Sequence, residues 1–420
     1  MSLSPRPGGI LARHFGPAAG TCGLLTVLGL AAYGPPSAAR ELHQPRVEAM
    51  ASPADTGAVG PRLAHGPGGR PLLSWIEARP QGGHRFRFAT LEGHHWSSPR
   101  TIAEGDSFFV NWADYPGVTA LATGELAAFW MWRTGADTYA YDVRVSFSRD
   151  GGLHWTPPTT PHRDATQTEH GFVSLIPEGA AARAVWLDGR KMAGKEEGSP
   201  GAEMTLRTAR IDPSGALSDE RELDDRTCDC CATAATRTRS GTVIAYRDRT
   251  ANEQRDIALV RQVGATWSEP GVPHSDGWII PGCPVNGPAL DADGDRLALA
   301  WYTAAHESAS VYVTLSPDGG KTFGAPAHVD QGRPLGRVDV ALLAEGGALV
   351  SWLEAGEKTA RIQNRVISAA GVAGPIWTIA TTSSRRASGF PRILRVGSTI
   401  LAAWTEAGSP SRIKLARYQL

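Results

Sequence analysis

Four cysteines in the second half of the chain could bind a metal ion. Three of them are almost consecutive, at Cys228, Cys230 and Cys231, and the fourth is Cys283. Thiolates are soft ligands that suit Cu(I) or Zn²⁺. His170 could add a nitrogen ligand to the same ion. These five residues form a candidate metal site, with copper or zinc as the candidate cofactor.

The same cysteines allow two other interpretations. In an oxidising compartment, four cysteines could form one or two structural disulfides, with three possible pairings. Adjacent Cα atoms lie about 3.8 Å apart, whereas half-cystines prefer about 4.4–6.8 Å, so a bond between Cys230 and Cys231 would be strained. A redox-active thiol pair is the third interpretation, because strained or exposed disulfides are the easily reduced ones. The sequence leaves all three open.

Arginines and carboxylates are also frequent near the cysteines. Arg190 follows Asp188, and Arg249 follows Asp248, with a further pair at residues 255–256. Forked guanidiniums could hold an anionic or polyhydroxy ligand. The alternative is a solvated rim in which these groups pair with one another.

A repeated strand pattern positions these residues. A short apolar segment with an internal aromatic residue recurs at intervals of 51 to 60 residues. Copies at this period, each with four short strands bounded by Gly, Asp and Pro, predict an all-β, seven-bladed β-propeller, with a six-bladed propeller as the alternative. The seven aromatic residues are Trp75, Trp130, Trp186, Tyr246, Trp301, Trp352 and Trp404.

The two ends of the chain complement each other. The last copy stops after its third strand, at residues 412–420. The segment 43–50 precedes the first copy and resembles the fourth strands elsewhere. We therefore expect the N-terminal segment to complete the seventh blade, which would remove the exposed edge of an open array.

Two turns between third and fourth strands carry a recognisable motif. Residues 148–155 (SRDGGLHW) match the pattern S-x-D-x-G-x-x-W, and residues 316–323 (SPDGGKTF) match it with Phe for Trp. In such turns the Asp accepts backbone hydrogen bonds and Gly adopts a positive φ. With these turns in a sevenfold repeat, residues 45–420 resemble the Asp-box (BNR repeat) sialidase-like β-propeller family.

The resemblance implies which face carries function. In that family the Asp boxes are structural and lie on the face away from the active site. Functional residues are then expected in the loops that lead into each first strand, here called the leading loops, and in those joining second to third strands. The cysteines at 228–231 and 283 lie in the leading loops of adjacent copies four and five, so we expect them to meet at the mouth of the axial funnel.

The resemblance also implies candidate catalytic residues. Sialidases bind the substrate carboxylate with three arginines and use a Tyr nucleophile, activated by a Glu, with an Asp as acid/base. The family's Phe/Tyr-Arg-Ile-Pro motif is not found at residues 55–75, and the nearest string, residues 390–393 (FPRI), is permuted. By this resemblance the catalytic candidates are Arg190, Arg249, Arg337, Asp248 and Tyr302, with Tyr246 as an alternative nucleophile.

The N-terminus and the charge restrict location and partners. Residues 1–39 combine Arg6 and Arg13 with an apolar run at 22–33 and a small-residue site at 37–39, which predicts a signal peptide before a single domain at 40–420. The run is too short to span a bilayer, which needs about 18 apolar residues. A formal net charge of +0 without a basic stripe favours no nucleic-acid partner. We expect a periplasmic or secreted monomer with no stable membrane span.

Three functions are compatible with these patterns. The first hypothesis is an exported propeller with a cysteine-rich ligand, metal or thiol-redox site in the axial funnel. The second is an exo-acting glycoside hydrolase of the sialidase class, and the third is a non-catalytic binding or scaffold propeller. The expected partner is accordingly a small molecule, a metal ion or a glycan.

Overall fold

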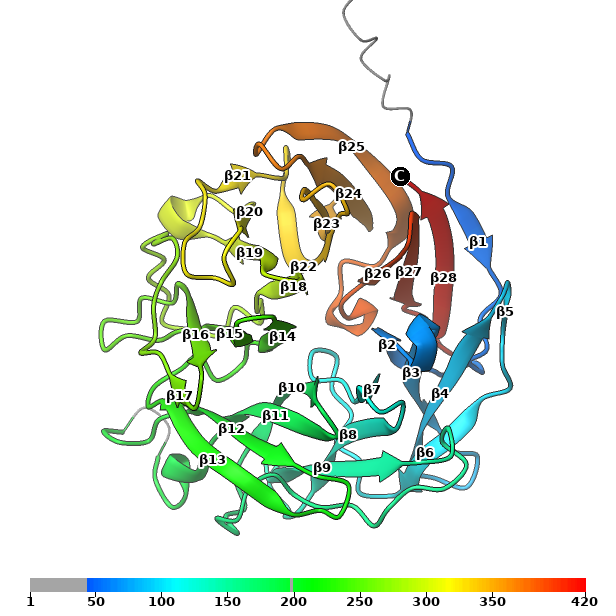
Figure 1. Cartoon of the computed structure of the whole chain (residues 1–420), viewed down its shortest axis with the longest axis vertical. Helices are drawn as coiled ribbons and strands as arrows, with labels where there is room; N and C mark the ends of the chain where they lie inside the picture. The colour runs from blue at the N-terminus through cyan, green and yellow to red at the C-terminus, as the bar shows by residue number, and fades with distance from the viewer. Residues whose placement is uncertain (1–43, 197–198) are drawn as a thin grey trace, which may run out of the picture. The chain divides into compact units, whose positions relative to one another are not determined.

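Seven antiparallel β-sheets follow one another around a central axis in the computed structural model (Figure 1), which confirms the seven-bladed β-propeller. The structure describes residues 44–196 and 199–420. The predicted signal peptide, residues 1–39, lies outside the described residues. Within them, no helix has the length and apolar character needed to cross a membrane.

Each blade runs from an innermost first strand outward. Blade 1 has a fifth strand, and in blade 2 a bridge between Val145 and Thr159 takes the place of the fourth. Blade 1 contains β2 (Val59–His65), β3 (Pro71–Ala78), β4 (His84–Glu92), β5 (His95–Trp96) and β6 (Arg100–Gly105), and blade 2 contains β7 (Gly117–Ala120), β8 (Leu126–Arg133) and β9 (Tyr141–Ser148). Blade 3 contains β10 (His170–Glu178), β11 (Ala181–Asp188), β12 (Thr205–Ile211) and β13 (Leu217–Asp224), blade 4 contains β14 (Ala234–Thr238), β15 (Gly241–Arg247), β16 (Ile257–Val263) and β17 (Thr266–Trp267), and blade 5 contains β18 (Ala289–Asp293), β19 (Arg296–Thr303), β20 (Ser310–Ser316) and β21 (Ala327–His328). Blade 6 contains β22 (Pro334–Leu342), β23 (Ala348–Ala355), β24 (Ala360–Ile367) and β25 (Ala373–Thr382), and blade 7 contains β26 (Arg392–Val396), β27 (Thr399–Glu406), β28 (Arg412–Gln419) and β1 (Glu48–Met50). Four short 3₁₀ turns are η1 (Pro67–Gly69), η2 (Arg190–Met192), η3 (Ala305–Glu307) and η4 (Arg386–Ser388).

The N-terminal strand closes the ring, as the sequence predicts. Strand β1 pairs with β28, with Glu48 opposite Arg417 and Met50 opposite Leu415. Figure 1 shows the blue and red ends of the propeller side by side. The apolar side chain of Val47, just before the strand, packs against the core shared by blades 6 and 7. The seventh blade is therefore built from both ends of the chain.

The repeated aromatic residues of the second strands form the centre of each blade. Trp75, Trp186 and Trp352 are at most 1% exposed. In these three blades the indole N–H donates to a carboxylate two residues later, at 2.7–2.9 Å. Residues i and i+2 of a strand share a face, so a Trp-x-Glu or Trp-x-Asp pattern satisfies the buried N–H locally, and an unpaired buried donor would be costly.

The two Asp-box turns are held by their own side chains. Ser148 Oγ accepts from Gly152 N–H at 2.8 Å and donates to Asp150 at 2.9 Å. Asp150 accepts from the backbone N–H of His154, which holds the pKa of that carboxyl well below its usual value. The turn at 316–323 repeats these bonds. Because antiparallel strands alternate direction, both turns lie at the end of the propeller opposite the leading loops.

Side chains that cross between blades position the leading loops. Asp114 Oδ2 accepts from the N–H of Phe172 at 2.9 Å, and Asn286 Oδ1 accepts from that of Arg337 at 2.7 Å. Phe172 and Arg337 both have φ of 53°, in the left-handed region that non-glycine residues rarely adopt. Such strain costs about 1–3 kcal/mol per residue and persists only where the surroundings impose it. The blade-to-blade hydrogen bonds supply that constraint.

Candidate functional site: a thiol cluster in the leading loops of blades 4 and 5

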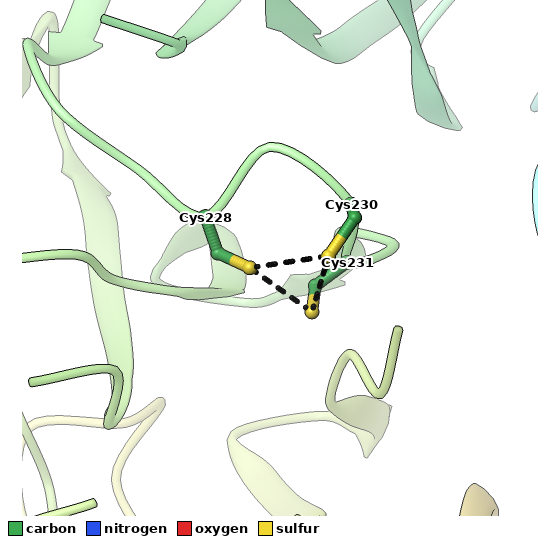
Figure 2. Close-up of side chains that lie close together, drawn as sticks. All are labelled: Cys228, Cys230 and Cys231. Carbon is green, nitrogen blue, oxygen red and sulfur yellow. Dashed lines mark hydrogen bonds between the residues drawn. The ribbon is translucent and has the colours of Figure 1, made fainter. Parts of the chain in front are cut away.

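Three cysteine side chains converge in the leading loop between β13 and β14 (Figure 2). The Sγ atom of Cys228 lies 3.2 Å from that of Cys231 and 3.7 Å from that of Cys230, and the Cys230 and Cys231 sulfurs are 4.0 Å apart. Cys228 and Cys231 are 0% and 1% exposed, while Cys230 is half-buried. All three are free thiols in the structure.

The neighbouring leading loop of blade 5 brings the fourth cysteine to this cluster. A Cβ atom on Gly287 would lie 2.1 Å from the carbonyl oxygen of Ala232, so only glycine permits this approach of the two loops. Cys283 is exposed, and its Sγ lies 3.7 Å from Asp229 Oδ1. The ligand atoms of Asp229, Cys230 and Cys283 lie within 4.8 Å of one another. The structure thus brings the four predicted cysteines to one place.

Two arginines lie beside the cluster, and one of them, Arg255, is also paired with Glu253 at 2.7 Å. Arg255 Nη1 lies 3.3 Å from Cys228 Sγ. Arg247, only 1% exposed, donates to three backbone carbonyls at 2.6–2.9 Å and has no ion pair within 4.0 Å among the described residues. The thiols of Cys230 and Cys231 hydrogen-bond to Cys228 and, with the Arg247 charge, lower its pKa well below the usual value. Such a thiol is a good nucleophile and metal ligand.

The sulfur spacing fits a single metal ion. A Zn–S bond of about 2.3 Å in a tetrahedral site places sulfurs about 3.8 Å apart. The observed separations of 3.2–4.0 Å bracket that value. Small side-chain rotations would therefore place three sulfurs around one Zn²⁺ or Cu(I) ion.

A cleft of about 660 Å³ opens beside the cluster. Its lining includes Asp229, Cys230 and Cys283 from blades 4 and 5, with Glu169 and Trp112 from blades 3 and 2. Burial raises the pKa of Glu169 to about 8, so this carboxyl is largely protonated at neutral pH. The cleft therefore combines an aromatic face, a neutral carboxyl and thiols, which could contact a polyhydroxy ligand or an ion.

The cleft also carries positive charge. The guanidinium of Arg386, in η4, lies 5.6 Å from the ring centroid of Trp112. A guanidinium held on an aromatic face keeps its N–H groups free for a carboxylate or a hydroxyl. Arg386 makes no ion pair within 4.0 Å among the residues that the structure describes. It is thus available to a ligand in the cleft.

His170 does not lie with the cysteines, contrary to the sequence-based hypothesis. Its ring stacks on that of His162, with centroids 3.9 Å apart and planes 5° apart. The nearest carboxylate oxygens belong to Asp164 at 3.3 Å, Asp188 at 3.7 Å and Asp142 at 3.8 Å. No group of potential ligands in the described residues joins His170 to a cysteine.

The surroundings of His170 are those of an ion-pair network. The oxygen of Asp188 that faces His170 already accepts from Trp186 and Arg190, both at 2.7 Å. Because the histidine rings are parallel, one ion could not lie in both ring planes. Burial alone would lower the pKa of His170, but the carboxylates, led by Asp164, raise it above the usual value. The surrounding carboxylates stabilise the charged form of His170, which accounts for the arrangement without a metal.

The predicted catalytic residues are held by contacts with other groups, and none of them lines the cleft. Arg190 pairs with Asp188 at 2.7 Å and Arg249 with Glu253 at 2.8 Å. Arg337 donates to Ser388 and to the carbonyl of Gly389 at 2.8 and 2.9 Å, and lies over the ring of Trp112. The structure therefore gives each arginine its own partners.

The remaining two candidates, Asp248 and Tyr302, also have partners of their own. Asp248 accepts from the N–H of Arg249, and burial raises its pKa to about 6. The ring of Tyr302 packs edge-on against Trp278, and burial raises its pKa. A raised pKa is the opposite of what an activated tyrosine nucleophile needs. The alternative, Tyr246, is buried and bonded to Asp224, with its pKa raised as well.

Sequence reasoning did not place Asp229, Glu169 or Arg255 at the cluster, although Arg255 belongs to an Arg–Asp pair that it considered for ligand binding. Asp229 lies inside the cysteine run and Glu169 directly precedes His170, so their positions could have suggested a role. Arg255 comes from the loop after β15, and no local pattern links it to Cys228. The signal that could have pointed to Arg255 was its charge and its position in a loop joining a second to a third strand, where functional residues were expected.

Comparisons with known proteins support the fold. No family model and no curated protein matches the chain. Among solved structures, an ulvan lyase from a polysaccharide lyase family is 11% identical with a TM-score of 0.58, covering 88% of this chain and 95% of that chain. A protein of unknown function from Dyadobacter fermentans is 14% identical with a TM-score of 0.50, covering 89% and 98%. These similarities show a shared β-propeller fold.

Proposed function

We propose that the chain is an exported β-propeller that binds one soft metal ion, Cu(I) in the first place, through Cys228, Cys230 and Cys231. The observation that carries the proposal is the convergence of three reduced sulfurs within 4.0 Å of one another. Thiolate ligands favour Cu(I) and Zn²⁺ over harder ions. The cluster borders an open cleft, so a bound ion would remain accessible to a further ligand.

The number of ligands favours Cu(I) for the three-cysteine set. Structural Zn²⁺ sites almost always have four protein ligands, and Cys283 does not lie within 4.8 Å of all three inner sulfurs. Zn²⁺ would therefore need Cys283 to move to the inner sulfurs as a fourth ligand.

Metal analysis of purified protein tests this proposal. Copper and zinc are both supplied under anaerobic, reducing conditions, and we expect about one copper ion per chain. Cys231→Ser should lose most of the bound metal, whereas His170→Gln should retain it, because His170 lies in a separate network. Less than about a tenth of an ion per wild-type chain would refute the proposal, since thiolate sites bind these ions tightly. Reduction-resistant disulfides, seen by mass spectrometry, would instead support the structural disulfide interpretation.

A second candidate is a carbohydrate-active enzyme, namely an exo-acting glycoside hydrolase of the sialidase class. The cleft favours it, because Arg386 could bind a substrate carboxylate and a protonated Glu169 could donate a proton to a glycosidic oxygen. Membership of the Asp-box family, suggested by the two turns, would agree with this. One related solved structure is an ulvan lyase bound to a GlcA–Rha3S saccharide.

Fluorogenic sialosides and uronate-containing polysaccharides distinguish the two candidates. Turnover that is abolished by Glu169→Gln and unaffected by Cys230→Ser would favour the glycoside hydrolase. Metal binding without turnover would favour the thiolate site. A protein that shows neither would be a non-catalytic binding or scaffold propeller.

We also propose that residues 1–39 direct export to the periplasm or the medium. The signal-peptide pattern supports this. Cell fractionation of the full chain, with N-terminal sequencing of the product, is the test. A product that begins near residue 40 in the exported fraction is expected, and an intact cytoplasmic chain would contradict export.

A further inference from the structure

We infer that Asp229, Cys230 and Cys283 form a second, outer metal site, which receives the ion and passes it to the buried cysteines through the shared Cys230. The inference rests on the proposed metal-binding function. It concerns the route by which the ion enters the site.

The two sets of ligands overlap at one residue. The inner set is Cys228, Cys230 and Cys231, and the outer set is Asp229, Cys230 and Cys283, each with its ligand atoms within 4.8 Å. No group among the described residues combines Cys283 with Cys228 or Cys231. Cys230 is therefore the one thiol that could hold an ion in either set without leaving it.

Exposure decreases from the outer set to the inner set. Cys283 is exposed and Cys230 is half-buried, whereas Cys228 and Cys231 are at most 1% exposed. The cleft is lined by the outer ligands but by neither buried cysteine. An ion that comes from solvent or from a carrier thus meets the outer ligands first.

The transfer needs only ligand exchange. Cys283 and Cys230 bind the ion as thiolates, each thiol releasing its proton to water, while the carrier's ligands leave. The Cys228 thiolate then bonds to the ion, while the Asp229 carboxylate leaves and Cys283 leaves and takes up a proton. Cys231 finally completes the inner set with loss of its proton to water. Copper stays in the Cu(I) state throughout, so no oxidant or reductant takes part.

The direction of transfer follows from the ligands. The inner set offers three thiolates, whereas the outer set offers two thiolates and a carboxylate, which is a harder and weaker ligand for Cu(I). Cys228 and Cys231 are also buried, so competing ligands in solvent cannot easily reach an ion that they hold. An ion should therefore rest in the inner set.

Loading kinetics of single-residue variants test the inference. Cu(I) is supplied as a complex with a coloured bidentate chelator, whose loss of colour reports transfer to reduced protein in a stopped-flow instrument. Cys283→Ser should load at least about tenfold more slowly, yet bind one ion with an affinity within about threefold of wild type, because the inner thiolates remain. Asp229→Asn should slow loading less. Ile279→Ala, an exposed site in the same loop, controls for general loop disturbance.

The possible results distinguish a separate outer site from its alternatives. Wild-type loading in Cys283→Ser would overturn the outer site while leaving the proposed function intact. A loss of affinity in Cys283→Ser as large as in Cys231→Ser would also overturn it, because Cys283 would then be a permanent fourth ligand. If the wild-type protein takes up no Cu(I), the proposed function fails, and the inference fails with it.

Discussion

The hydroxyl of Tyr141 donates a hydrogen bond of 2.7 Å to Oε1 of Glu169. This bond joins the third strand of blade 2 to the leading loop of blade 3 at the edge of the cleft. The bond would favour the ionised carboxylate, but burial outweighs it and raises the pKa of Glu169 to about 8. The folded protein therefore keeps a proton on Glu169 that the unfolded chain releases at a lower pH.

Glu169→Gln should remove the loss of stability that follows when the buried Glu169 carboxyl has to ionise. Between about pH 4.5 and pH 8 the unfolded chain binds fewer protons than the folded one, so stability falls as pH rises through this window. The thermal midpoint of Glu169→Gln should rise relative to that of wild type as pH increases from about 4.5 to about 8, and above pH 8 the difference should stay constant. Melting curves at several pH values measure this, with Glu92→Gln at an exposed strand end as the control. A difference that does not change with pH would contradict a protonated Glu169.

His170→Gln should destabilise the protein mainly at low pH. The pKa of His170 is raised above its usual value of about 6.5 in the folded state, so its contribution is fully present below pH 6.5 and is lost as pH rises through the folded pKa. The deficit of the variant relative to wild type should therefore shrink at alkaline pH. Chemical denaturation across this range is the measurement. A deficit that grows with pH would mean that His170 is neutral in the folded protein.

Thiol alkylation should follow the exposure of the four cysteines. We expect iodoacetamide to modify Cys283 first and Cys230 next, and to modify the buried Cys228 and Cys231 last. The Cys230 thiol hydrogen-bonds to Cys283 and lowers its pKa, so the alkylation rate of Cys283 should rise at a lower pH than for free cysteine. Peptide mass spectrometry against time and pH measures both. Cys230→Ala should move the pH midpoint of Cys283 upward, and no movement would assign the shift to another group.

Deletion of residues 44–50 should destabilise the whole propeller. The deletion removes β1, leaves β28 as an open edge and uncovers the apolar surface under Val47 and Met50. We expect aggregation or a large fall in the thermal midpoint, measured by calorimetry and light scattering. Glu48→Gln breaks only the exposed ion pair with Arg417 and should cost at most about 1 kcal/mol. A deletion variant that stays monomeric and melts like the full protein would show that ring closure depends on other contacts.

The sequence by itself determined the architecture of this protein. The aromatic second strands recur because each blade must bury one large side chain at its centre, and this requirement repeats with the blade. The Asp-box turns satisfy their own polar groups within eight residues, so their sequence is nearly sufficient for their structure. The closing strand was predictable because a missing fourth strand at one end matched a spare strand at the other.

Only the tertiary structure decided which side chains meet. Arg255 reaches Cys228 across the space between two loops of blade 4, and Cys283 reaches Asp229 from another blade, so no local pattern could show either contact. His170 was expected beside the cysteines because its leading loop is next to theirs, yet its side chain lies against His162 and three carboxylates. A blade repeat fixes where each loop begins, but the direction of a side chain depends on the backbone bend and on the partners offered by neighbouring blades. For this reason the sequence was enough to predict that the thiols lie together in adjacent leading loops, and the fold determined the charges that surround them.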